Sequence, residues 1–119
     1  MNEVMTTDEF EDWFEDLTRS QQQASAKAIE RLEGEMLRLG YPHSSKLNGA
    51  KLAIRELRFK DGDHPIRIAY AFDPARDAVL LIGGDKKGDD RFYDWFVPRA
   101  DQIFGEYLAE NFGGTKGKR

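Results

Sequence analysis

IRIAYAFDPARDAVLLIG, residues 66–83, contains two apolar segments joined by a short polar link. In IRIAYAF (66–72) every second side chain is large and apolar, which predicts a β-strand with one apolar side. AVLLIG (78–83) is apolar throughout, as expected of a strand that is covered on both faces. The link DPARD is rich in turn formers and too short for the crossover that parallel neighbours require. These residues therefore predict an antiparallel pair of strands.

The segment before this pair extends the predicted sheet by one strand. LAIRELRF (52–59) is short and rich in apolar residues, and the link DGDHP separates it from the next strand. Three consecutive strands with such short links predict an antiparallel meander.

Helices are expected on both sides of the meander in the chain. Residues 7–17 carry apolar side chains at helical spacing, and so does an alanine-rich segment between Ser20 and Gly40. A further helix is expected after Tyr93, with Pro98 in its first turn. The predicted fold class is α+β, with two antiparallel N-terminal helices packed on an antiparallel sheet and a C-terminal helix. One domain is expected to span 1–112, followed by a disordered basic tail, 113–119.

The composition limits the classes of function. The 119 residues include no cysteine, which excludes disulfides and thiolate metal sites. No apolar run is long enough to span a membrane and the N-terminus does not resemble a leader, so a cytoplasmic protein is expected. Residues 1–35 hold ten acidic and three basic side chains, whereas 36–119 hold twelve acidic and fifteen basic. This imbalance predicts a basic surface on the later part of the chain, although charge runs are more often solvated faces.

Three charged residues are expected on one face of the sheet. Alternation puts Glu56 and Arg58 on the same side of their strand, and Arg67 points away from the apolar side of the next strand. If the apolar sides meet the helices, these residues share the uncovered face. Arginine forks match phosphate oxygens, so this face could bind an anionic backbone. Arginines lining a solvated sheet face explain the same pattern equally well.

The segment IGGDKKGDDRFY (82–93) ends the third strand and carries Lys86 and Lys87 in a turn bounded by glycines. Its spacing differs from that of a nucleotide-binding P-loop. Its aspartates lack the spacing of a calcium loop and are interpreted as turn and capping residues, so neither a metal nor a cofactor is predicted. Tyr93 could stack on a base, give a proton or pack in the core.

The segments LAIRELRF, IRIAYAF and VLLIGGDKKGDDRFY, in this order after two helices, resemble the RelE/ParE superfamily of bacterial toxins. The similarity is greatest to its phage-derived, HigB-like branch and covers Val4 to Phe112. It implies the toxin of a type II toxin–antitoxin pair, an endoribonuclease (mRNA interferase) that cuts ribosome-bound mRNA without a metal and inhibits translation. In such enzymes the ribose 2′-hydroxyl attacks the neighbouring phosphate while basic side chains stabilise the added charge.

The resemblance also implies roles for single residues. Arg58 and Arg67 are expected to bind and stabilise the phosphate, and Lys87 to act as a charge stabiliser or acid. Tyr93 is expected to stack on or orient the nucleotide. Glu56 occupies a position where the RelE pattern has a basic residue, so it is expected either to be the general base or to pair with Arg58. The remaining substrate contacts are assigned to Lys86, Arg55 and Arg91.

The expected partners are a cognate antitoxin, a small helix-turn-helix protein of the HigA type, and mRNA on the ribosome. A different class of function shares the fold, because ParE-like gyrase inhibitors bind their target without cutting RNA. A third interpretation is an inactive relic that only binds its antitoxin.

Overall fold

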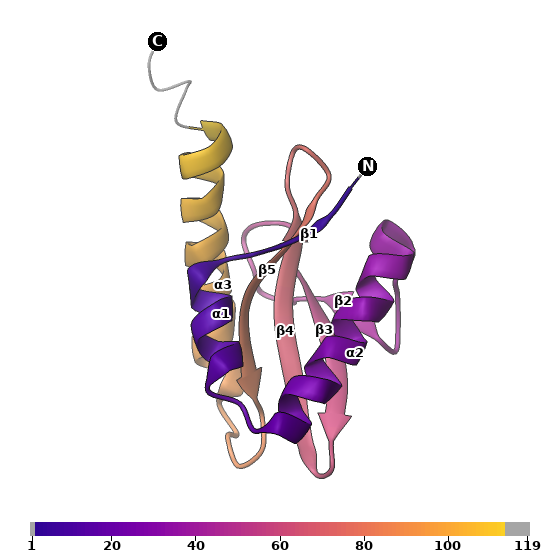
Figure 1. Cartoon of the computed structure of the whole chain (residues 1–119). Coiled ribbons are helices and arrows are strands. Elements are labelled where there is room, and N and C mark those ends of the chain that lie inside the picture. The colour runs from indigo at the N-terminus through magenta and orange to yellow at the C-terminus, as the bar shows by residue number, and fades with distance from the viewer. Residues whose placement is uncertain (1, 114–119) are drawn as a thin grey trace.

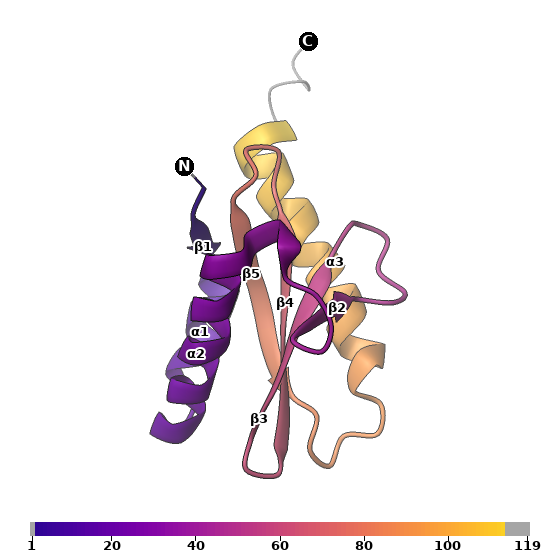
Figure 2. The ribbon, with the colours of Figure 1, turned by 90° about the vertical axis from the view of Figure 1, so that its right-hand side faces the viewer.

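The protein, seen in a computed structural model that describes residues 2–113, is built around a five-stranded sheet. Helices α1 and α2 cover one face and α3 covers the other (Figures 1 and 2). The α+β class predicted from the sequence is confirmed. The strands are β1 (Val4–Thr6), β2 (Ser44–Lys46), β3 (Arg55–Asp61), β4 (His64–Phe72) and β5 (Ala78–Asp85), and the α-helices are α1 (Asp8–Glu15), α2 (Arg19–Glu35) and α3 (Phe92–Leu108).

The sheet is mixed, and the prediction of a purely antiparallel sheet is wrong in this respect. Its strand order is β1-β5-β4-β3-β2, and the three predicted strands do form an antiparallel meander. The short strand β1 pairs in parallel with β5, and the short strand β2 pairs antiparallel with β3. Both added strands have only three residues, too few to produce a recognisable alternation of apolar side chains.

Threonines begin the two N-terminal helices. The Thr7 hydroxyl accepts a hydrogen bond from the Phe10 N–H at 3.0 Å. Thr18 and Gln21 form a reciprocal capping box at the start of α2. Helix α2 ends at Glu35 and continues into a single 3₁₀ turn, Met36–Arg38, so the regular helix is shorter than the segment predicted from the sequence.

Helix α3 begins earlier than predicted. It starts at Phe92, so Pro98 lies inside the helix rather than in its first turn. Phe92 and Phe96 are both buried against the sheet, and this burial favours a helix that extends through the proline. As a consequence, Tyr93 lies in the first turn of α3 instead of in a loop. A π turn, Ala109–Gly113, follows α3.

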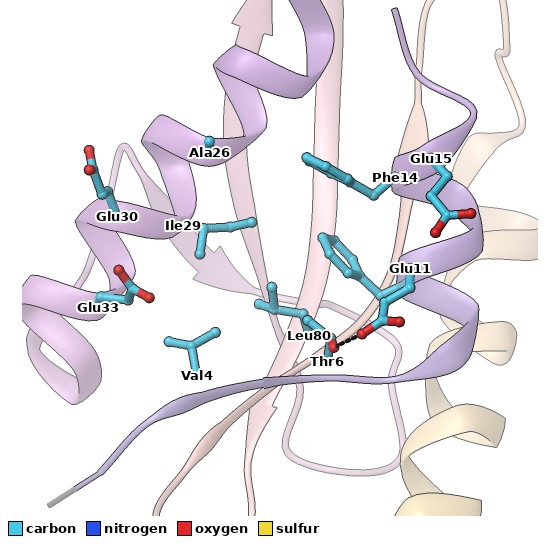
Figure 3. Close-up of a pocket in the computed structure, with 11 residues that line it drawn as sticks. Val4, Thr6, Glu11, Phe14, Glu15, Ala26, Ile29, Glu30, Glu33 and Leu80 are labelled. Atoms are coloured by element: carbon cyan, nitrogen blue, oxygen red, sulfur yellow. Dashed lines mark hydrogen bonds between the residues drawn. The ribbon is translucent and has the colours of Figure 1, made fainter. Parts of the chain in front are cut away.

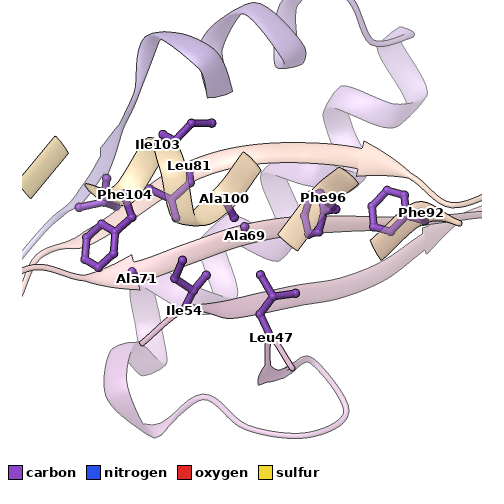
Figure 4. Packing of buried hydrophobic residues seen from close by; sticks show 11 residues of the cluster. Leu47, Ile54, Ala69, Ala71, Leu81, Phe92, Phe96, Ala100, Ile103 and Phe104 are labelled. Atoms are coloured by element: carbon purple, nitrogen blue, oxygen red, sulfur yellow. The ribbon is translucent and has the colours of Figure 1, made fainter. Parts of the chain in front are cut away.

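Two hydrophobic cores lie on opposite faces of the sheet. The core beneath α1 and α2 includes Phe10, Leu32 and Tyr70. The core beneath α3 joins three aromatic residues of the helix to aliphatic residues of the sheet and the preceding loops (Figure 4). The sheet face predicted to be uncovered is therefore covered by α3, because the apolar stripe of that helix needs a surface on which to pack.

Two adjacent glycines bring both helical layers close to β5. Gly83 faces α1, and a Cβ there would clash with the ring of Trp13. Gly84 faces α3, and a Cβ there would lie 2.6 Å from Cε1 of Phe92. Only the absence of side chains at these positions lets both rings approach the strand.

The last described turn of the chain reaches the first residue of the predicted tail. Gly113, the first residue of the predicted disordered tail, ends the π turn, and residues 114–119 of that tail lie outside the described residues. Within 2–113, no helix combines the length and the apolar character that crossing a bilayer requires.

Candidate active site

A buried carboxylate on β3 is the centre of the candidate site. Glu56 is only 5% exposed. Its Oε1 accepts a hydrogen bond of 2.8 Å from the Tyr93 hydroxyl, which arrives from α3. Its Oε2 accepts a bond of 3.3 Å from the Ser45 hydroxyl and lies 3.5 Å from Nη1 of Arg58. A carboxylate this buried is stable as an anion only when such partners surround it.

Two arginines lie beside this carboxylate. Arg58 and Arg67 are directly opposite each other in the β3–β4 pair, so both project from the face that α3 covers. Arg67 is 7% exposed, and its Nε lies 3.8 Å from Glu56 Oε1 and donates to the Tyr93 hydroxyl at 3.3 Å. Like charges directly opposite on a sheet repel each other, and Glu56 offsets this repulsion. The sequence correctly predicted that Glu56, Arg58 and Arg67 share a face.

Lys86, which follows the last residue of β5, joins Glu56, Arg58, Arg67 and Tyr93 in one cluster of side chains. Its ammonium lies 4.9 Å from the centre of the Tyr93 ring, a cation–π contact. Burial lowers the pKa of Lys86, and the nearby charges of Arg67 and Arg58 lower it further while Glu56 opposes them. Lys86 therefore releases its proton more readily than an ordinary lysine.

The Tyr93 hydroxyl joins the acidic and basic parts of the cluster. It donates to Glu56 and accepts from Arg67. Burial raises the pKa of Tyr93, and the hydrogen bond to Glu56 raises it further. The phenol therefore stays protonated near neutral pH, and its proton points at a carboxylate.

The three other basic residues predicted to bind substrate or act in catalysis lie outside this cluster. Lys87 turns away and forms an ion pair of 2.8 Å with Asp63 in the β3–β4 turn, an interaction that lowers the pKa of Asp63. Arg91 pairs with Asp94, and its side chain is 86% exposed. Arg55 points to the opposite face of the sheet, where its Nε donates to the hydroxyl of Ser44.

The sequence did not point to two residues that contact the cluster. Ser45 reaches Glu56 from β2, a strand too short to leave a pattern. Tyr41 is 79% exposed, and the Arg58 guanidinium lies 5.8 Å from the centre of its ring. An aromatic residue in a loop gives no spacing signal, so only the fold could bring Tyr41 beside Arg58.

The aspartates around the β5–α3 loop act mainly as turn and helix-start residues. Asp85 accepts from the Lys87 N–H and contacts His64 Nδ1, and Asp89 accepts from the N–H of Arg91 and from the indole of Trp95. Among residues 2–113, no group of three or more His, Asp or Glu side chains is arranged to hold a metal ion.

The geometry of the cluster suits an anionic substrate. Three cationic side chains, those of Arg58, Arg67 and Lys86, surround one carboxylate and one phenol. Arg58 is the more accessible of the two arginines: its side chain is 30% exposed, whereas Arg67 is buried. Cations of this kind stabilise charge on a phosphate, and a carboxylate can accept a proton from an attacking hydroxyl.

Comparison with known proteins identifies the family. The family described as "Phage derived protein Gp49-like (DUF891)" matches residues 12–104. The chain is 42% identical to "Putative toxin HigB3" of Mycobacterium tuberculosis H37Rv, over 93% of this chain and 97% of that protein. It is 39% identical to "Putative toxin HigB2" of the same organism, over 90% of this chain and 54% of that protein. The chain belongs to the phage-derived Gp49-like family, whose members include HigB-like proteins.

Proposed function

We propose that this protein is the toxin of a toxin–antitoxin pair and that it inhibits translation by cutting mRNA with the Glu56 cluster, which consists of Glu56, Arg58, Arg67, Lys86 and Tyr93. The toxin part of the proposal rests on the names of the two related mycobacterial proteins. The cleavage part rests on one observation: the Tyr93 hydroxyl donates to the buried Glu56 carboxylate amid three cationic side chains.

The proposed reaction is a transesterification within the RNA that uses no metal. The ribose 2′-oxygen bonds to the adjacent phosphorus, and the bond from phosphorus to the 5′-oxygen breaks. The 2′-hydroxyl gives its proton to the Tyr93 oxygen as Tyr93 passes its own proton to Glu56. Lys86 gives a proton to the departing 5′-oxygen. The products are a 2′,3′-cyclic phosphate and a 5′-hydroxyl.

The contacts within the cluster support this division of roles. The raised pKa of Tyr93 suits a neutral relay better than an anionic base, and the lowered pKa of Lys86 suits a proton donor. Arg58, the accessible arginine, would bind the phosphate. Arg67 is buried and hydrogen-bonded to Tyr93. Its proposed role is to orient the phenol and to stabilise the charge of Glu56.

The proposed partners follow from the proposed role. A toxin of such a pair needs a cognate antitoxin, for which we propose a helix-turn-helix protein of the HigA type. Cutting of mRNA on the ribosome would explain how a chain with a net charge of −4 reaches its substrate, since the ribosome would position the message. A RelE-like arrangement of the whole domain is part of the same proposal.

The positions and the chemical groups of the RNA ends test the proposed cleavage of mRNA. In cells given a pulse of expression, sequencing of RNA ends should detect new cuts within translated codons, and the upstream fragments should carry 2′,3′-cyclic phosphates. Growth arrest with intact messages and an induced DNA-damage response would instead indicate inhibition of gyrase. Normal growth with abundant folded protein would indicate an inactive relic.

The two adjacent lysines provide a sharper test of the site. Lys86→Ala should lower the cleavage rate at least about tenfold, because a hydrogen bond to a charged group contributes roughly 1.5–3 kcal/mol. Lys87→Ala should leave the rate within about threefold of the parent, because its ammonium is paired with Asp63 away from the cluster.

Both lysine variants remove one positive charge, so each is the control for the other. The measurement is the single-turnover rate of cleavage on ribosome-bound message. Lys86→Arg should remain slow, since a guanidinium keeps its proton. If Lys87→Ala were the slower variant, the role of proton donor would belong to Lys87, as the family resemblance implies.

A further inference from the structure

An apolar groove lies between β1, α1 and α2 (Figure 3). It is on the opposite face of the sheet from the Glu56 cluster. Its volume is about 490 Å³. Aromatic and aliphatic side chains form its floor: Phe10 and Phe14 from α1, Ile29 from α2, Val4 from β1 and Leu80 from β5. Exposed Ala26 leaves space on the α2 side. An apolar groove of this kind can bind the apolar face of another segment.

Four glutamates stand around this floor: Glu11 and Glu15 on α1, and Glu30 and Glu33 on α2. All four are exposed. Glu11 accepts a hydrogen bond from Thr6, and the other three have no ion-pair partner among residues 2–113. In the part of the chain that the structure describes, no basic side chain lines the groove, and Lys27 and Arg31 of α2 line a separate hollow beside β3.

The charge and shape of the groove exclude several occupants. The tail GTKGKR (114–119) has the right charge, but it has no large apolar side chain to cover the floor. A second copy bound through the same groove would bring eight glutamates together, which is unfavourable. Nucleic acid and an anionic membrane would be repelled by the same carboxylates. A partner with both apolar and basic side chains satisfies both features.

We propose that the α1–α2 groove is a docking site for an amphipathic helix of a partner protein whose apolar stripe is bordered by lysine or arginine. The apolar stripe covers the floor, and the basic borders pair with the glutamates. Because the groove and the Glu56 cluster are on opposite faces, the partner binds without covering the cluster. The proposal does not depend on cleavage of RNA, so the two can fail separately.

The probe is a synthetic helical peptide of about three to four turns, since three to four turns is the mean helix length in proteins. Leucines at helical spacing form one stripe, and lysines border it. One control peptide carries glutamates in place of the lysines, and a second carries serines in place of the leucines. Fluorescence anisotropy of labelled peptide with the full chain measures binding at low and at high salt.

The lysine-bordered peptide should bind, and both control peptides should bind at least about tenfold more weakly. The double variant Glu30→Lys/Glu33→Lys should lose at least about tenfold in affinity for the lysine-bordered peptide, and added salt should weaken binding to the parent. The matched control is Asp12→Lys/Glu35→Lys, which makes the same change in charge at exposed positions outside the groove. This control should bind as the parent does.

Three outcomes would overturn the docking proposal. The first is absence of binding by the lysine-bordered peptide at low salt. The second is equal affinity of the two charge-reversed variants, which would indicate non-specific attraction. The third is a dimer of the parent in light scattering that dissociates in Glu30→Lys/Glu33→Lys, which would assign the groove to a second copy. Circular dichroism confirms beforehand that each variant is folded.

Discussion

Glu56→Ala is expected to abolish cleavage and to lower the free energy of unfolding by about 3 kcal/mol. Removing one member of a buried ion pair leaves the other without compensation, which typically costs about 3–5 kcal/mol. Arg67 would be the uncompensated charge, and the Tyr93 hydroxyl would lose its acceptor. Urea denaturation followed by circular dichroism measures the loss of stability, and single-turnover cleavage measures the loss of activity.

The control variant, Glu56→Gln, separates the structural role of this residue from its chemical role. Its amide oxygen can still accept from Tyr93, so it should destabilise the fold much less than alanine. It cannot take a proton at neutral pH, so cleavage should fall about a hundredfold, the lower end of the usual effect of general acid–base catalysis. A glutamine variant that cleaves at the parent rate would show that Glu56 only holds the arginines and Tyr93 in position.

Phe96→Ala is expected to lower the free energy of unfolding by about 4 kcal/mol, because replacing a fully buried phenylalanine leaves a cavity. Phe96 is 0% exposed, and the centre of its ring lies 4.6 Å from that of Phe92 (Figure 4). The centre of the same ring lies 6.1 Å from that of Tyr93. Urea denaturation measures this change. Cleavage should fall as well, because the cavity lies directly beside the turn that holds Tyr93.

Trp95→Ala is the matched control for this cavity. It removes a larger ring from the neighbouring position of α3, but Trp95 is 43% exposed. The cost should therefore be about 1–2 kcal/mol, since less apolar surface leaves water on folding. A larger loss of stability in Trp95→Ala than in Phe96→Ala would mean that the core beneath α3 depends on the exposed ring rather than on Phe96.

The sequence predicted best the elements in which apolar side chains recur at a regular spacing. Alternation in β3 and β4 separated Leu57 and Ile68 from Glu56 and Arg67, and the structure has these pairs on opposite faces. Alternation divides a strand into two sides, but it does not say what covers each side. For this reason the sequence could not show that α3 packs over the charged face and buries Glu56.

Lys86 and Lys87 are adjacent but point in different directions, and the sequence did not predict this difference. Lys86 contacts the Tyr93 ring, whereas Lys87 contacts Asp63 on another turn. Both residues follow the last strand and precede Gly88, which has a positive φ of 72°. In such a turn the side-chain directions depend on the local backbone and on contacts distant in sequence, here with the β3–β4 turn. The family resemblance therefore assigned a catalytic role to Lys87, whereas the contacts support our proposal of Lys86.

The paired glycines of β5 let α1 and α3 contact the same point of the sheet. At Gly83 and Gly84 the rings of Trp13 and Phe92 approach the same short piece of backbone from opposite sides. A single stretch of backbone without side chains therefore separates the two rings. We therefore expect a displacement of α1 to reach the first turn of α3 at this point, two residues before Lys86.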